Sequence, residues 1–163
     1  MTHWMEAVYR AERRGLFLLA LSITSDHQRA EDAVHDAVTR VCRQRRPPAG
    51  QRVAYVYRAV RNAALDGQRR AQVRQASLFD EALVSPQRQG GVEEQIAVAE
   101  AESIVRKAID GLSPDLREVV VLRLANGLSF RQMADVLDEP TMTVADRYHR
   151  ALALLRPSLE HLA

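Results

Sequence analysis

Apolar residues recur at helical spacing through the first 70 residues, and this pattern predicts three helices. The first covers about residues 2–22. The second opens near Ser25 or Asp26, either of which can cap it, and presents an acidic face opposite its apolar stripe. The helix-breaking run at residues 47–50 separates it from a third helix over about residues 52–70. The polar face of that third helix is rich in arginine.

The same periodicity predicts four helices after residue 91. The first covers about residues 92–109, and Ser113-Pro114 starts the next, which ends at Asn126-Gly127. Ser129 and Gln132 form a capping box for a short helix. After a turn at Glu139-Pro140, a longer helix starts near Thr141 or Thr143. Two helices joined by such a tight turn are typical of a helix-turn-helix, whose second helix enters the DNA major groove.

Between these halves, residues 71–91 lack sustained periodicity and are rich in Gln, Arg and Ser, which is typical of a linker. The 163 residues contain few strong strand formers and only 7 glycines. The sequence therefore predicts an all-α protein with two small helical domains, residues 1–70 and residues 92–163, joined by a linker over residues 71–91.

The charges are unevenly divided between the two halves. Residues 1–70 hold 13 arginines against 7 acidic residues, a charge of +6, whereas residues 92–163 hold 8 basic and 12 acidic residues, a charge of −4. The basic half indicates a polyanionic partner such as nucleic acid. Solvated helix faces would have the same composition, so charge alone leaves both interpretations open.

Several classes of protein are disfavoured. The chain has no glycine-rich phosphate loop and a single cysteine, Cys42, and its five histidines share no metal-ligand spacing. We therefore expect no catalytic residues, no metal and no cofactor. The apolar run at residues 16–21 is much shorter than the roughly 20 residues that span a bilayer. Glu6 and Glu12 precede that run, which is atypical of a signal peptide. We expect a cytoplasmic protein without membrane insertion.

Two stretches carry a family resemblance. Residues 112–156, which include Leu-Ser-Pro-Asp-Leu-Arg and Gly-Leu-Ser-Phe-Arg-Gln-Met-Ala, resemble region 4 of sigma-70 family factors. The N-terminal half resembles region 2 through Ala30-Glu31-Asp32-Ala33-Val34 and through residues 54–66. The two regions occur in order, without a region 1 or region 3 domain. This arrangement is similar to that of the extracytoplasmic-function (group IV) sigma factors.

The resemblance implies a promoter-recognition subunit of RNA polymerase, with partners in the β′ and β subunits of the core enzyme, in promoter DNA and in an anti-sigma factor. It places core binding on the acidic face of the second helix, with Glu31, Asp32, His35 and Asp36. It places minus-ten recognition on the third helix, with Arg58, Arg61, Asn62, Asp66, Arg69 and Arg70. It also matches residues 44–52 to a loop that captures an unstacked base. Minus-35 recognition falls to Ser129, Phe130, Arg131, Thr143, Asp146, Arg147, His149 and Arg150.

The sequence departs from the family pattern at several positions. Family members usually carry Ser where Asp146 stands, and Lys, Arg or in some branches Ala at Ala145. Gly67 and Gln68 replace larger apolar or aromatic residues. A carboxylate on a groove-facing side repels phosphate, although it can accept a hydrogen bond from cytosine. A sigma-like interaction protein that binds a regulatory partner without productive promoter binding is therefore the alternative function.

Overall fold

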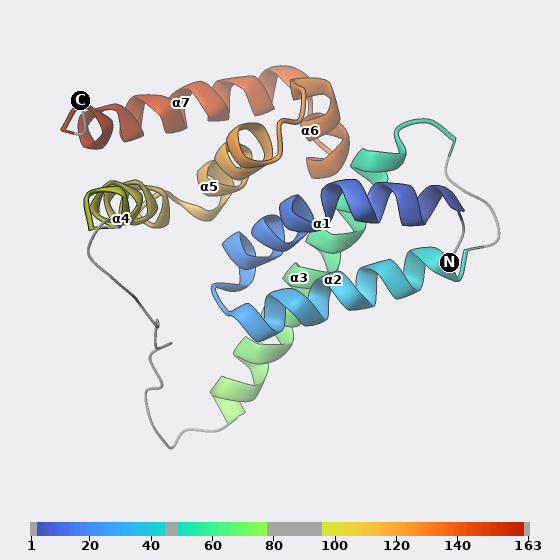
Figure 1. The fold of residues 1–163 in the computed structure, drawn as a ribbon. Helices are drawn as coiled ribbons and strands as arrows, with labels where there is room; N and C mark the ends of the chain where they lie inside the picture. Colours follow the sequence, from blue (N-terminus) through green and yellow to red (C-terminus); the bar gives the residue numbers. More distant parts are fainter. Residues whose placement is uncertain (1–2, 45–48, 78–95, 162–163) are drawn as a thin grey trace.

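The computed structural model describes residues 3–44, 49–77 and 96–161, and all the regular structure in these ranges is helical (Figure 1). The all-α prediction is therefore confirmed. The helices are α1 (His3–Thr24), α2 (His27–Cys42), α3 (Arg52–Ser77), α4 (Ile96–Asp110), α5 (Pro114–Val120) with its π-helical continuation η2 (Val121–Ala125), α6 (Phe130–Leu137) and α7 (Thr141–Glu160).

Helices α1, α2 and α3 pack against one another around one apolar core. The stripes that the periodicity predicts face inward on α2 and α3, where Val34, Val41, Val56 and Val60 are buried. Asp26 is the residue that caps α2, because its carboxylate accepts the backbone N–H of Arg29 at 2.8 Å. This three-helix unit positions the acidic face of α2 and the arginine face of α3.

Helix α3 continues to Ser77, beyond the end at residue 70 that the apolar pattern predicts. Residues 71–76 are mostly good helix formers, Ala, Gln and Arg, so the helix persists without an apolar stripe to bury. Val73, the one large apolar side chain in this stretch, is exposed. The rest of the predicted linker, residues 78–91, lies outside the described residues, as do residues 45–48 of the loop matched to base capture.

Helices α5, α6 and α7 form the helix-turn-helix half, and α4 packs on α5 and α7. The capping box at the start of α6 is present as predicted, and α7 begins at Thr141. Two residues in the left-handed conformation make the turns around α6. Gly127 (φ +66°) follows η2, and Asp138 (φ 57°) ends α6.

The two halves pack on each other within the described residues. Helix α6 lies against α3, while α5 and η2 lie against α1, so segments far apart in the sequence are neighbours in space (Figure 1). Buried residues of both halves belong to one continuous apolar cluster. No helix in the described ranges combines the length and the apolar character that crossing a membrane requires.

Candidate nucleic-acid and partner interfaces

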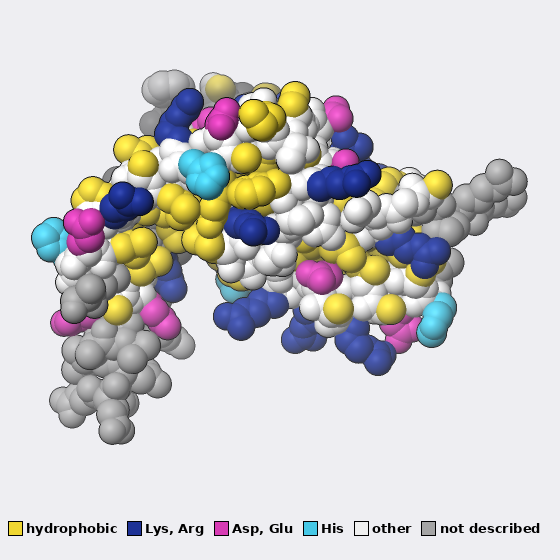
Figure 2. Space-filling view, turned by 90° about the horizontal axis from the view of Figure 1, so that it is seen from above, with side chains coloured by type: hydrophobic (Ala, Val, Ile, Leu, Met, Phe, Trp, Pro, Cys, Tyr) yellow, Lys and Arg dark blue, Asp and Glu magenta, His cyan; other side chains and the backbone are white. Residues whose placement is uncertain are grey.

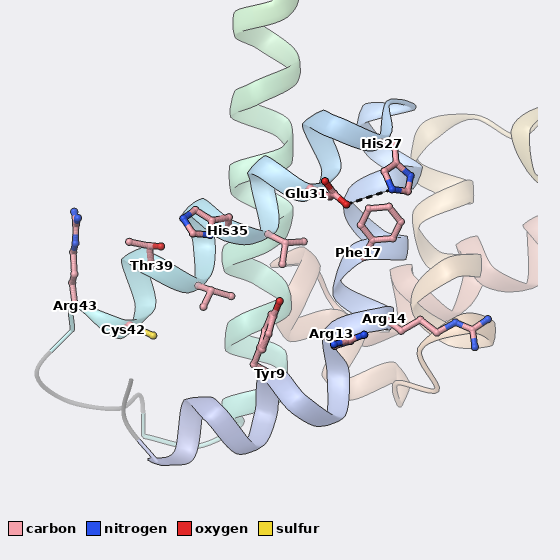
Figure 3. A pocket seen from close by; sticks show the side chains of 12 residues that line it. Tyr9, Arg13, Arg14, Phe17, His27, Glu31, His35, Thr39, Cys42 and Arg43 are labelled. Carbon is pink, nitrogen blue, oxygen red and sulfur yellow. Dashed lines mark ion pairs between the residues drawn. The ribbon is translucent and has the colours of Figure 1, made fainter. Parts of the chain in front are cut away.

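The acidic face of α2 is exposed, and it borders two separate grooves. Glu31 and His35 line a groove between α1 and α2 (Figure 3), whereas Asp32 and Asp36 line a groove between α2 and α3. The four residues that the resemblance assigns to core binding are therefore adjacent and accessible. They present two surfaces to a partner rather than one.

The groove between α1 and α2 has an apolar floor with polar margins. Phe17 of α1 packs edge-on against His27 of α2, with ring centroids 4.8 Å apart, and His27 Nε2 lies 3.4 Å from a carboxylate oxygen of Glu31 (Figure 3). Val34 and Val38 also line the groove. A partner that binds the acidic residues here therefore also finds apolar contact area.

The arginine face of α3 is divided by the packing of the two halves. Arg58 and Arg61 point at the helix-turn-helix half, and both form ion pairs with it. Asn62, Arg69 and Arg70 are exposed. The residues predicted to act together at the minus-ten element thus lie in two different environments.

The pair formed by Arg61 is the best organised contact of α3 in the described structure. Arg61 Nε lies 2.7 Å from Glu118 Oε1, and its Nη2 lies 3.2 Å from Oε2, which is bidentate geometry. Arg58 Nη2 lies 2.8 Å from Asp138 Oδ1. Further along α3, the Asp66 carboxylate lies 3.8 Å from Arg69, which fits an orienting role for Asp66.

Arg147, a predicted reader of the minus-35 element, is held by carboxylates within its own half. Its guanidinium bonds both oxygens of Glu139, at 2.9 and 2.8 Å, and its Nε lies 3.9 Å from Asp115. Only 26% of its side chain is exposed. These contacts tie α7 to the turn before it and to the start of α5, so Arg147 helps to set the orientation of α7.

The start of α6 is also largely engaged by its own half. Gln132 Oε1 accepts the Ser129 N–H at 2.9 Å, and Ser129 Oγ accepts the Gln132 N–H at 3.1 Å. The Phe130 ring packs against Tyr148 with centroids 5.5 Å apart, and the Arg123 guanidinium lies 4.8 Å from its centroid. The backbone N–H groups of Ser129 and Gln132 are therefore both paired within the capping box, which leaves this helix start two fewer N–H groups to offer a phosphate.

The exposed members of the predicted minus-35 set are Ser129, Arg131, Asp146, His149 and Arg150, while Thr143 is half-buried. Figure 2 shows Lys and Arg side chains spread over the upper face, with acidic and hydrophobic side chains between them. The exposed apolar residues Met142, Leu154 and Leu159 lie on α7. This half therefore offers a few separate cations, in keeping with its net negative charge.

The sequence gives no signal for the contacts that join the two halves. Arg117 of α5 joins the halves through its Nη1, which donates to the carbonyl oxygen of Ser22 in α1 at 3.4 Å. Within its own half, Arg117 donates to the carbonyl oxygens of Asp110 at 2.7 Å and Leu112 at 3.1 Å. The Asn126 amide packs close to Gly15 of α1. Arginine side chains commonly bond the free carbonyl groups at the end of a helix, so the contacts of Arg117 with the end of α4 have a local explanation. Its contact with α1 depends on the tertiary structure.

The described residues hold no group of three or more histidine, cysteine or carboxylate side chains placed to bind a metal ion. One carboxylate has a clearly perturbed affinity for protons. A hydrogen bond with Ser113 lowers the pKa of Asp115 from its ordinary value of 3.8. Burial opposes this shift, and backbone hydrogen bonds in the first turn and, last, the nearby Arg147 lower the pKa further. This environment favours the charged form of Asp115 in the first turn of α5.

Comparison with known proteins gives two family matches. Residues 8–74 match the model for Sigma-70 region 2, and residues 102–155 match the model for Sigma-70, region 4. Both matches fall on the halves described above, in the expected order. Together they cover most of the chain.

Curated relatives are extracytoplasmic-function (ECF) sigma factors. ECF RNA polymerase sigma factor SigL of Mycobacterium tuberculosis is 28% identical over 166 residues, which cover 97% of this chain and 90% of SigL. SigE of Mycolicibacterium smegmatis is 28% identical over 98% of this chain and 62% of SigE. ECF RNA polymerase sigma-E factor of Haemophilus influenzae is 33% identical over 43% of this chain and 37% of that protein. The chain thus spans 37% of the Haemophilus influenzae factor and 62% of SigE, in both cases less than two thirds of the relative's length.

A solved structure with the same fold is the sigma factor RpoE of Bartonella quintana in complex with the anti-sigma factor NepR. The TM-score is 0.69 at 23% identity, and the match covers 98% of each chain. The fold, the two ordered family matches and the relatives agree with the resemblance seen in the sequence. This chain belongs to the sigma-70 family, with region 2 in its N-terminal half and region 4 in its C-terminal half, and its relatives are factors of the ECF type.

Proposed function

We propose that this protein binds core RNA polymerase and directs promoter recognition and transcription initiation, in the cytoplasm. The observation that carries the proposal is the presence of regions 2 and 4 in order over most of the chain. The exposed acidic face of α2 and the helix-turn-helix supply the surfaces that such a subunit needs. Members of this family regulate transcription, so we expect this protein to act by binding polymerase and DNA.

The surfaces divide this work by their chemistry. The carboxylates of α2 face a basic partner surface on the β′ subunit. Arginines on α3 suit phosphates and base edges of the minus-ten element, because guanidinium groups donate several hydrogen bonds in a fixed plane. On α7, Arg150 and His149 are the exposed candidates for minus-35 contacts, and Arg147 acts by positioning them.

The test is to reconstitute the protein with core polymerase and to sequence the 5′ ends of the resulting transcripts. We expect start sites that appear only when the protein is added. The variant D32R/D36R reverses two exposed charges on α2 and should abolish both co-purification with core polymerase and the new start sites. The matched control E100R/E102R reverses two exposed charges on α4 and should retain both.

A second candidate function is that of a sigma-like protein that binds an anti-sigma factor without productive promoter binding. The engagement of Arg58 and Arg61 by region 4 favours it, and the fold neighbour RpoE is seen in complex with an anti-sigma factor. Transcripts with protein-dependent starts would exclude this alternative. Polymerase binding without any new start site would favour it, and loss of both would contradict the proposed function.

A further inference from the structure

The groove between α1 and α2 is large enough to hold a small molecule. Its volume is about 990 Å³, at the upper end of the ~300–1,000 Å³ that is typical of ligand sites. Figure 3 shows Tyr9 rising from α1 into the space between the two helices, with the sulfur of Cys42 turned toward the same space. Val34 and Val38, both buried, line the groove from α2, and Phe17 lines it near the start of that helix. The groove therefore offers an apolar bed to a ligand.

The charges around this apolar bed are mostly positive. Three arginines and two histidines line the groove, and Glu31 is the one acidic side chain among its described lining residues. Glu31 already has a partner, because its carboxylate lies 3.4 Å from His27 Nε2. The side chains of the arginines make no ion pair or hydrogen bond with any described residue; they are Arg13, Arg14 and Arg43. An anionic group that enters the groove therefore meets cations whose charge is not already balanced.

An apolar bed bordered by unpaired cations fits one chemical class of ligand. An amphiphilic anion can bury an apolar body between Tyr9 and Phe17 while its anionic head stays in water beside Arg13 or Arg43. A carboxylate suits these arginines, because a guanidinium pairs with it through two parallel N–H donors. The groove between α2 and α3 lacks this combination, since it is smaller, at about 390 Å³, and is lined by carboxylates as well as arginines.

Building on the proposed function, we propose that the groove between α1 and α2 binds a small amphiphilic carboxylate, and that the bound ligand opposes the docking of core polymerase. Glu31 and His35, to which we assign core binding, line the same groove. A ligand in the groove covers the apolar surface between them and adds a negative charge beside it. Ligand and polymerase therefore compete, and each lowers the affinity of the protein for the other by the same factor.

The first experiment uses the single cysteine of the chain, Cys42, as a reporter of occupancy in the full-length protein. Iodoacetamide alkylates its thiol, and mass spectrometry gives the rate. The probe is decanoate, below the concentration at which it forms micelles, and it should slow alkylation several-fold in a saturable manner. Octanoate should need a higher concentration, because each buried methylene group tightens binding by up to about fourfold. Decyltrimethylammonium, with the same chain and a positive head, should give no protection.

Two matched double variants test the cations. R13Q/R43Q removes two arginines that line the groove, whereas R29Q/R40Q removes two exposed arginines of α2 that do not line it. Decanoate should no longer protect the thiol in R13Q/R43Q and should still protect it in R29Q/R40Q. The rates with and without decanoate are compared within each variant, because a nearby arginine also affects the thiol itself. Circular dichroism checks that each variant keeps its helix content.

Nuclear magnetic resonance gives a second measurement that does not depend on the thiol. The methyl signals of Val34 and Val38 should shift as decanoate is added, while those of Val119 and Val120, buried in the other half, should not. Unchanged alkylation together with unchanged methyl signals overturns the ligand site. Equal protection by decyltrimethylammonium overturns the role of the cations. Protection by phosphatidylglycerol vesicles but not by decanoate overturns the proposal in favour of a membrane surface.

The second experiment adds core polymerase. Decanoate should reduce the co-purification of the parent protein with core polymerase and should have no such effect on R13Q/R43Q. Full polymerase binding by protein that is saturated with decanoate overturns the competition. The first experiment contains no polymerase, so a protein that binds decanoate but never binds polymerase contradicts the proposed function and leaves the ligand site standing.

Discussion

At Gly15, two side chains from other parts of the fold meet the backbone of α1. The Tyr57 hydroxyl donates a 2.8 Å hydrogen bond to Glu12 one turn before Gly15, and the Asn126 amide approaches from region 4. Burial raises the pKa of Tyr57 above its ordinary value, and the Glu12 carboxylate raises it further. A side chain at residue 15 would overlap the Tyr57 hydroxyl, so the site requires glycine for space.

We therefore predict opposite effects for two Gly→Ala substitutions in helices. Gly15→Ala should lower the free energy of unfolding by about 1–3 kcal/mol, because overpacking outweighs the better helix propensity of alanine. Gly67→Ala should raise it by up to about 1 kcal/mol, since no atom lies near the Cβ that it would add. Urea denaturation followed by circular dichroism measures both. Effects of the same sign would contradict the packing at Gly15.

Asp146 is exposed on α7 beside the cations that face outward. We predict that Asp146→Ser leaves minus-35 binding unchanged or tightens it, because the substitution removes a carboxylate from the helix face that we propose enters the groove. Arg150→Ala, the comparison variant, should weaken binding and reduce the slope of log affinity against log salt by about one. A cytosine scan of the minus-35 element checks the first effect. Weaker binding confined to one base pair would identify Asp146 as a reader of cytosine.

At the scale of the elements, local signals predict the helix-turn-helix well. The capping box at Ser129, the start of α7 and the apolar stripes all depend on residues within one or two turns of each other, and each is present. The continuation of α3 to Ser77 escaped prediction because it depends on helix propensity without burial. The π-helical turn after Val120 likewise has no periodic signature.

The start of α5 gives a prediction on pH. The pKa of Asp115 is lowered in the folded protein, so its interactions stabilise the fold above the ordinary value of 3.8 and are lost as pH falls through the lower folded value. Asp115→Asn should thus be less stable than the parent above about pH 5, with the difference vanishing at lower pH. Thermal unfolding across pH 2–7 measures this. A difference that persists at the lowest pH would contradict the assignment.

At the scale of the whole molecule, the sequence predicts which residues share a helix face but not what covers that face. The spacing of Arg58 and Arg61 predicts their common side of α3, and the structure places both on that side. Their partners lie far away in the chain, and 57 residues separate Arg61 from Glu118. Periodicity reports only local order, so the sequence does not reveal the carboxylates that pair with these arginines.

The remaining prediction concerns the joint between the two regions. Residues 71–91 lack apolar periodicity, and α3 extends through residue 77, so limited trypsin digestion should cleave first at Arg88 rather than at Arg69, Arg70 or Arg74 within the helix. Two helical fragments should result. Because ion pairs and apolar contacts join the regions, the fragments of the parent should co-elute in gel filtration at low salt.

The E118Q/D138N variant is the comparison for this digestion. Its first cleavage should fall at the same arginine, because the substitutions lie in region 4, far along the chain from residue 88. Its fragments should separate at salt concentrations at which those of the parent remain together, since both inter-region ion pairs are weakened. First cleavage within residues 52–70 would contradict the domain boundary. Parent fragments that separate at every salt concentration would show that the chain connection, rather than the interface, holds the two regions together.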